Sequence, residues 1–353
     1  MKNSIDITAL LSAAIDIEKA RKTSVSVSVI VDETATPEFQ VFVRAGFNSD
    51  SINSRVMVSY FPTQTPDTTV SSDVVVIAAG KSDLVGHIAA EFRSNGAPVL
   101  VVAESGADVM ERAEKSGYAL PREDVVSPKI GQPFDEDIKG SLADDIGSWI
   151  VASSHEKRLA FSIAYPFVRR PLAYDAINAT AIQNAGVGLL VFIPGADMPV
   201  MTLNQAKMVL QIAAAYGQPL GVDRIKELAA VLGGALFFRG VSRQAAAFVP
   251  ALGWAIKAGM GYAGTLAIGH AALEYFENGG NIAGLASVVG KTKDSAFRAA
   301  SYVKGQPLCR SVADFAAPKV KNLARGLVSQ AAPIAQSAAR SAVSSVGFKG
   351  VHK

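Results

Sequence analysis

The sequence is poor in the residues that build covalent or metal-based sites. It contains one cysteine, Cys309, and four histidines in 353 residues. A single cysteine excludes an internal disulfide and a cysteine-built zinc site, and it fits a reducing, cytosolic setting. Charged residues make up only 18% of the chain and hydrophobic residues 49%, so either the core is large or a membrane takes part of it. We predict no catalytic residue, no cofactor and no metal ligand.

A secretory signal is also not expected. Residues 1–22 carry Asp6 and Asp16 and have neither a basic leader nor a small-residue cleavage pattern. The net charge is +3, but residues 291–353 hold eleven Lys/Arg and two Asp/Glu, whereas residues 1–290 hold 23 basic and 29 acidic side chains. The chain therefore ends in a basic segment that follows a mildly acidic body.

The first 150 residues predict an α/β domain with a mixed sheet. Helical spacing of apolar residues predicts a helix over 4–22. Alternating apolar residues predict strands over 24–31, 39–47 and 54–61, and the short polar link before the third strand favours antiparallel pairing of the last two. From residue 73 onward, buried strand patterns and helical patterns alternate, which is typical of a sheet covered by helices.

The closing part of this domain resembles the end of an Era-like GTPase domain. In that family the last strand leads into a Ser-Ala-Lys-like loop, here Ser127-Pro128-Lys129, and then into a terminal helix. The phosphate-binding loop G-x-x-x-x-G-K-[ST] is missing, because DETATPEF follows Val31 and no helix is expected before the next strand. The guanine-reading Asn-Lys-x-Asp motif is replaced by residues 104–108. The resemblance implies a degenerate, nucleotide-free relative of a GTPase domain, and an unrelated α/β sheet is the alternative.

The second half resembles a helical domain of unknown function found in YcjF-type, GTPase-associated bacterial proteins. The segments that carry the resemblance are YPFVRR at 165–170, the stretch from IPGADMPV to AAVLGG at 193–234, and FVPALGWAIKAGMGYAGTLAIGHAALEYFENG at 248–279. In that family this domain commonly follows an Era-like GTPase module. The resemblance covers about residues 155–280, and the family implies no established activity.

The helices of this half suit a bundle. Basic residues there are too sparse for a face that reads a DNA groove, so we predict no nucleic-acid partner. We divide the chain into an α/β domain (1–150), a helical membrane-associating domain (151–285) and a basic tail rich in Ala and Ser (286–353).

Residues 244–276 form a long apolar stretch that contains several glycines. Lys257 divides it into uncharged runs of 13 and 12 residues, which disfavours one simple membrane crossing. Small residues recur every four positions, a spacing that suits close helix contact in a membrane or in a soluble bundle. The residues predicted for membrane or helix packing are Trp254, Lys257, Gly259, Gly261, Gly264 and Gly269.

Two further features allow alternatives. His270 and Glu274 lie four residues apart and could form a metal or acid–base pair, but without a third partner a helix-surface contact or a core histidine is expected instead. In the tail, Lys319, Lys321 and Arg325 surround a short apolar stripe that could lie on an anionic membrane surface. A solvated basic tail is the alternative.

The leading hypothesis is a non-enzymatic bacterial scaffold or adaptor on the cytoplasmic side of the membrane. Its expected partners are membrane lipid or the inner-membrane surface, and a GTPase or another protein. Homo-oligomers are a further expectation. The alternatives are a nucleotide-dependent switch with non-standard binding residues and a cytoplasmic, soluble homo-oligomeric structural protein.

Overall fold

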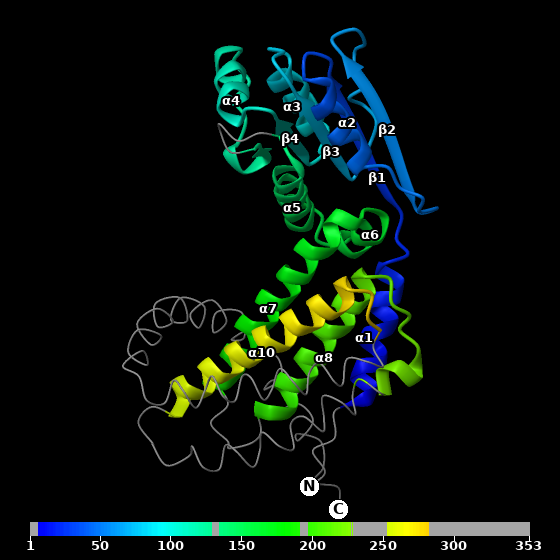
Figure 1. Cartoon of the computed structure of the whole chain (residues 1–353), viewed down its shortest axis with the longest axis vertical. Coiled ribbons are helices and arrows are strands. Elements are labelled where there is room, and N and C mark those ends of the chain that lie inside the picture. The colour runs from blue at the N-terminus through cyan, green and yellow to red at the C-terminus, as the bar shows by residue number, and fades with distance from the viewer. Residues whose placement is uncertain (1–5, 129–133, 191–196, 227, 229–252, 282–353) are drawn as a thin grey trace, which may run out of the picture.

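The computed structural model of the protein describes residues 6–128, 134–190, 197–226, 228 and 253–281. A sheet with its covering helices forms one part, and a group of long helices forms the other (Figure 1). This arrangement confirms the predicted order of an α/β domain followed by a mostly helical region.

The sheet has five strands in the order β2-β1-β3-β4-β5, and every described pair is parallel. The strands are β1 (Val25–Asp32), β2 (Ser54–Phe61), β3 (Val74–Ala79), β4 (Val99–Ala103) and β5 (Val125–Val126). β3 and β4 are buried along their whole length, as expected for continuous apolar strands between two helical layers.

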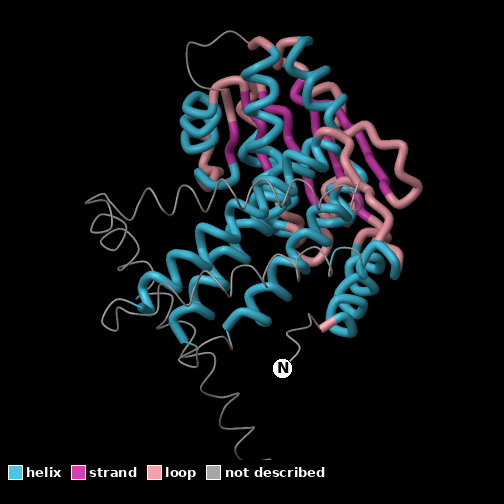
Figure 2. The backbone as a smooth tube through the Cα atoms, turned by 60° about the horizontal axis from the view of Figure 1, so that its bottom comes forward, coloured by secondary structure: helices cyan, strands magenta, loops and turns pink. Residues whose placement is uncertain are grey.

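Helices cover both faces of the sheet (Figure 2). They are α2 (Pro37–Gly46), α3 (Val85–Ser94), α4 (Gly106–Lys115) and α5 (Glu136–Ser153), with a short 3₁₀ helix, η1 (Arg122–Asp124), before β5. Buried residues of α2 and α5 pack on one face, and those of α3 and α4 on the other.

The strand predicted at 39–47 is wrong, because this segment lies in helix α2. Pro37 occupies the first turn, where its missing N–H costs nothing, and Phe39 and Val43 are buried one turn apart. With a helix between them, β1 and β2 pair in parallel, so the predicted antiparallel pairing and the mixed sheet are wrong as well. The helix expected to be missing after the first strand is therefore present.

The helical part begins at the amino end of the chain. It contains α1 (Ile7–Ala20), α6 (Arg158–Ala164), the 3₁₀ helix η2 (Pro166–Val168), α7 (Arg169–Leu190), α8 (Asp197–Ala215) and α10 (Gly253–Glu277). α1 precedes the sheet in sequence but lies beside α8 (Figure 1). One core cluster runs from α1 through one face of the sheet to α7, α8 and α10, so the two parts share a hydrophobic core.

Candidate functional site

The carboxyl ends of β1 and β3 lie where the strand order reverses, which is where doubly wound sheets bind ligands. In this protein Asp32, the last residue of β1, is fully buried there. One of its carboxylate oxygens accepts hydrogen bonds from Gly80 N (2.9 Å) and Ser82 N (3.1 Å). The other accepts from Thr34 N (3.0 Å) and Thr34 Oγ1 (2.7 Å). The carboxylate thus ties the loop after β1 to the loop after β3.

Further contacts extend this tie. Thr36 donates from its backbone N and its hydroxyl to the Glu104 carboxylate, which follows β4. A Cβ atom placed on Gly80 would lie 2.3 Å from Ala35 N, so the backbones of the two loops approach closely. Arg112 of α4 donates to Gly80 O at 2.8 Å. The chain's own backbone donors at the reversal point are therefore used to hold loops together.

The tripeptide Gly80-Lys81-Ser82 lies between β3 and α3, and Lys81 is exposed. Phosphate-binding loops place Gly-Lys-Ser between a strand and a helix, but they need an earlier glycine and free backbone N–H groups. Here the N–H groups of Gly80 and Ser82 bond Asp32, and Lys81 N bonds Thr34 Oγ1 at 2.6 Å. In this arrangement the three backbone N–H groups hold the loop after β1 and the loop after β3 together.

The amino ends of the strands meet the helical part through the segment YPFVRR. Tyr165 is fully buried, and its hydroxyl forms a 2.8 Å hydrogen bond with Ser54 Oγ at the start of β2. Burial raises the pKa of Tyr165, and the Ser54 bond partly opposes this rise. Phe47 packs edge-on against Tyr165 and Phe167 at centroid distances of 5.3 and 5.4 Å. The aromatic residues of this segment therefore dock the helical part on the sheet.

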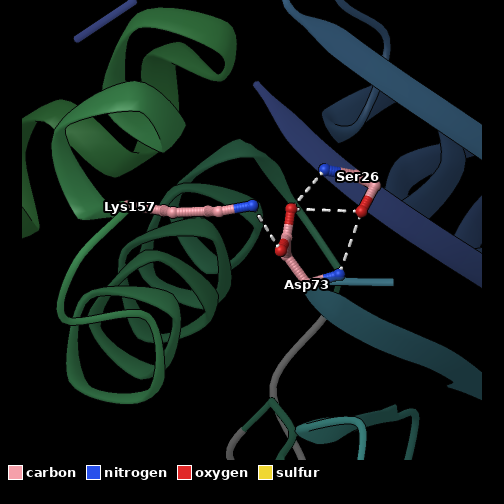
Figure 3. A network of polar contacts seen from close by, with 3 residues as sticks. All are labelled: Ser26, Asp73 and Lys157. Atoms are coloured by element: carbon pink, nitrogen blue, oxygen red, sulfur yellow. Dashed lines mark hydrogen bonds and ion pairs between the residues drawn. The ribbon is translucent and has the colours of Figure 1, made fainter. Parts of the chain in front are cut away.

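An ionic contact supports the same junction. Figure 3 shows Asp73, just before β3, between Ser26 of β1 and Lys157 of the loop before α6. One Asp73 oxygen accepts from Ser26 N (2.8 Å) and Ser26 Oγ (3.1 Å), and the other pairs with Lys157 Nζ at 2.6 Å. The Asp73 carboxylate thus joins two neighbouring strands to the helical part.

Arg170, the last residue of the YPFVRR segment, lies among three helices. It is 3.8 Å from Asp144 of α5 and 3.7 Å from Glu277 of α10, and its guanidinium lies over the Tyr174 ring. The hydrogen bond with Tyr174 is the main cause that raises the pKa of Arg170. Tyr216, at the end of α8, contacts Glu277. Burial is the largest cause that raises the pKa of Tyr216, and the Glu277 carboxylate raises it further.

Two of the predicted packing glycines lie close against α7. A Cβ atom on Gly269 would lie 2.6 Å from Ile177 Cγ1, and one on Gly261 would lie 2.9 Å from Asn184 O. Both glycines are buried and Gly264 is half-buried. Trp254, Lys257 and Gly259 belong to α10 by their backbone, and their surroundings lie outside what the structure describes.

A buried polar network fixes the same three helices. Asn184 of α7 donates to Thr265 Oγ1 (2.9 Å) of α10 and to Met201 O (3.2 Å) of α8. Gln205 of α8 also donates to Thr265 Oγ1, at 3.0 Å. Asn184, Gln205 and Thr265 are at most 2% exposed, so each bond forms in an apolar surrounding. The network sets the register of α7, α8 and α10.

The remaining predicted positions have simpler outcomes. His270 is exposed and packs edge-on against Tyr174 at 5.6 Å, so of the two expected alternatives it makes a helix-surface contact and is not a core histidine. Among the described residues, no group of three or more His, Cys, Asp or Glu is placed to hold a metal ion. The tail residues Lys319, Lys321 and Arg325 lie outside the described residues.

Sequence reasoning missed Asp32 and Asp73, although both have a recognisable signal. Each is an acidic residue at one end of a buried apolar strand, where a charge needs partners. It also missed the contact of α1 with α8, for which the sequence carries no local signal. None of the helices in the described ranges is long and apolar enough to cross a membrane.

Residues 167–296 match the family described as a domain of unknown function, DUF697. The matched residues begin within the YPFVRR segment and include α7, α8 and α10, and they overlap the range 155–280 that the sequence resemblance covers. No curated protein and no solved structure matches the chain. The helical domain of unknown function is therefore present, beside a parallel α/β domain.

Proposed function

We propose that the protein is a non-enzymatic, membrane-associated scaffold or adaptor of the GTPase-associated type. In this proposal the helical part attaches to the cytoplasmic side of a bacterial membrane, and the α/β part, a degenerate GTPase-like domain, is held away from it for a GTPase or another protein partner. The observation that carries the proposal is the apolar end of the helical part farthest from the sheet.

This end consists of the part of α7 that runs from Ile182 to its last residue, the first turn of α8 and the first half of α10. The Asn184–Met201 hydrogen bond and the contact of Gly261 with Asn184 place the three segments at the same level. α7 carries no charged residue after Asp175, the first turn of α8 carries Asp197, and Lys257 is the only charged residue of α10 before His270. Ile182, Val200 and Tyr262 are 40%, 45% and 40% exposed. The three side chains come from three adjacent helix segments, and a surface of exposed apolar side chains is where a protein meets lipid or another protein.

The α/β part supports a role that does not depend on bound nucleotide. The Asp32 tie holds the loops after β1 and β3 against each other at the position where related sheets take ligands. The aromatic and ionic contacts at the other end of the strands join this domain firmly to the helical part. A rigid two-part body of this kind suits an adaptor.

Vesicle co-sedimentation of the full chain tests the proposal. Vesicles of phosphatidylethanolamine and phosphatidylglycerol should pellet the protein. The triple variant Ile182→Asp, Val200→Asp, Tyr262→Asp should stay in the supernatant. The matched control carries Asp at Val41, Ile52 and Leu84, which are also exposed but belong to the α/β part, and it should still pellet. Unbound wild-type protein, or equal binding of both variants, contradicts attachment through this end.

A nucleotide-dependent switch is the second candidate, and Gly80-Lys81-Ser82 between β3 and α3 favours it. Titration with fluorescent GTP and ATP tests it directly. If the protein binds nucleotide saturably and Lys81→Ala abolishes this binding, the switch is supported and a scaffold that works without nucleotide is contradicted. Absence of saturable binding at high micromolar nucleotide would reject the switch.

A further inference from the structure

The two edges of the sheet differ in length. β5 is an edge of two residues, whereas β2 is an edge of eight residues that pairs only with β1. The pairing of β2 with β1 is continuous from Ser54 to Phe61, without a bulge. Figure 1 shows β2 at the rim of the sheet, and no described helix lies beyond it. Within the part of the chain that the structure describes, one long strand edge is therefore open.

The hydrogen bonds at both ends of β2 show which residues face outward. Val25 N donates to Asn53 O and Glu33 N donates to Phe61 O, both at 2.8 Å. Because N–H and C=O groups alternate in direction along a parallel strand, the odd-numbered residues face β1. Val56 and Val58 therefore direct their N–H and C=O groups away from the sheet, and no described residue pairs with these groups.

Most of the usual protections of an edge strand are absent here. Proteins block edges with short strands, charged side chains (lysine above all), proline or bulges. β2 is long and contains neither lysine nor proline, and Pro62 follows only after its last residue. Its single charge is Arg55, and Val58 is 41% exposed. Such an edge is a template for another strand.

We infer that β2 pairs antiparallel with β2 of a second copy of this chain, about a two-fold axis at Met57. In this register Val56 lies opposite the partner's Val58, and Val58 opposite the partner's Val56, so the outward N–H and C=O groups bond reciprocally. Met57 lies opposite the partner's Met57, and Arg55 lies opposite the partner's Ser59. The valine pairs are favourable cross-strand neighbours, and no like charges face each other.

The second copy is favoured over an unrelated strand because the edge is self-complementary and the assembly closes. Pairing through β2 uses the only long edge among the described strands of each sheet and leaves two-residue β5 strands at both ends. Growth beyond two copies therefore has no comparable edge, as expected for an isologous two-fold dimer. A single strand pair buries less than a standard interface, so a concentration-dependent dimer is expected.

Disulfide trapping of the full chain in mild detergent tests the register. In a Cys309→Ser background, Met57→Cys should form an inter-chain disulfide under mild oxidation. Residues opposite each other in a non-hydrogen-bonded pair are close enough for this bond. Ser59→Cys, on the same strand and the same face, should cross-link at least tenfold less. Equal cross-linking of both variants, or none by Met57→Cys, overturns the proposed register.

Sedimentation velocity tests the edge itself. Val58→Pro removes an outward N–H and leaves the pairing with β1 in place, because the Val58 N–H does not face β1. Wild type should shift from monomer to dimer with concentration, and Val58→Pro should remain monomeric with unchanged circular dichroism. The control is Val41→Lys, because Val41 is an exposed valine on α2 and a proline there would break the helix. This variant should still dimerise.

A wild-type monomer at all concentrations, or a Val58→Pro dimer, refutes the inference. If Val58→Pro loses the circular dichroism signal of the folded protein, Val58→Lys is measured in its place. A Val58→Lys variant that still dimerises also refutes the inference. The outcome is independent of the proposed membrane role, since vesicle binding is measured separately and maps to the opposite part of the molecule.

Discussion

Gly269→Ala is the sharpest test of how α10 packs on α7. The new Cβ atom would lie 2.6, 2.9 and 3.2 Å from Cγ1, Cγ2 and Cβ of Ile177, which is fully buried. Real Cβ contacts below 3 Å are not tolerated, so α10 must move away or Ile177 must leave its rotamer. Overpacking of this kind costs about 1–3 kcal/mol.

The same substitution also favours the helix. Alanine is preferred over glycine in a helix interior by about 1 kcal/mol. The net effect of Gly269→Ala should therefore be a loss of about 1 kcal/mol in the free energy of unfolding. Gly140→Ala in α5 is the matched control, because a Cβ atom there meets nothing within 4 Å. It should gain about 0.5–1 kcal/mol, so the two variants should differ by about 2 kcal/mol.

Denaturant unfolding of the full chain in mild detergent, followed by far-ultraviolet circular dichroism, measures both variants. Ile177→Ala in the Gly269→Ala background adds a double-mutant cycle, and the coupling should be favourable because Ile177 is the group that clashes. If Gly269→Ala stabilises the protein as much as Gly140→Ala does, the close approach of α10 to α7 is wrong.

Three further changes test the ties within the chain. Asp32→Ala should lower the free energy of unfolding by about 3 kcal/mol in urea unfolding, because it leaves buried backbone donors unpaired; a loss below about 1 kcal/mol contradicts the loop tie. Lys157→Met should cost about 1 kcal/mol, since the Asp73 pair is partly exposed, and the cost should shrink at high salt if the pair is ionic. Tyr165→Phe tests how stability falls at alkaline pH. Because the pKa of Tyr165 is raised in the folded protein, the unfolded chain loses the phenol proton at a lower pH. The contribution of Tyr165 to the free energy of unfolding is therefore complete below pH about 10 and is lost as the pH rises. The phenylalanine variant should lose about 1 kcal/mol at neutral pH and show a shallower alkaline fall in pH-dependent urea unfolding, and an unchanged fall would exclude Tyr165 as its cause.

Local hydrophobic patterns predicted most helices and strands, but they failed in one segment that fits both the strand period and the helix period. In residues 39–47 apolar side chains occur at every second position, and Phe39, Val43 and Phe47 also recur every fourth position. The pattern fits a strand and a helix equally well. Thr36 and Pro37 favour a helix start, and the helix also provides the crossover that parallel strands need. The error in one segment therefore changed the expected sheet from parallel to mixed.

Some residues of the helix contacts have a signal in the sequence and others have none. Gly261 and Gly269 stand out in the sequence because small residues recur on one helical face, and the structure places both against α7. Asp32 and Gly80 are 48 residues apart, and no local period connects them. The junction of Tyr165 with Ser54 spans 111 residues, so the role of the YPFVRR segment in docking the sheet could not be read from the segment itself.

The sequence by itself determined that the continuous apolar runs of β3 and β4 are buried strands, that α10 carries small residues on one face, and that a standard phosphate-binding loop is missing, because these features depend on residues near one another in the chain. Only the tertiary structure decided that all strands are parallel, that α1 belongs with α8, and that Asp32 ties two loops together. These features depend on pairing between distant segments, which is governed by shape, burial and the need of buried charges for partners. The open edge of β2 belongs to the second group, since a strand becomes an edge only through the order of its neighbours.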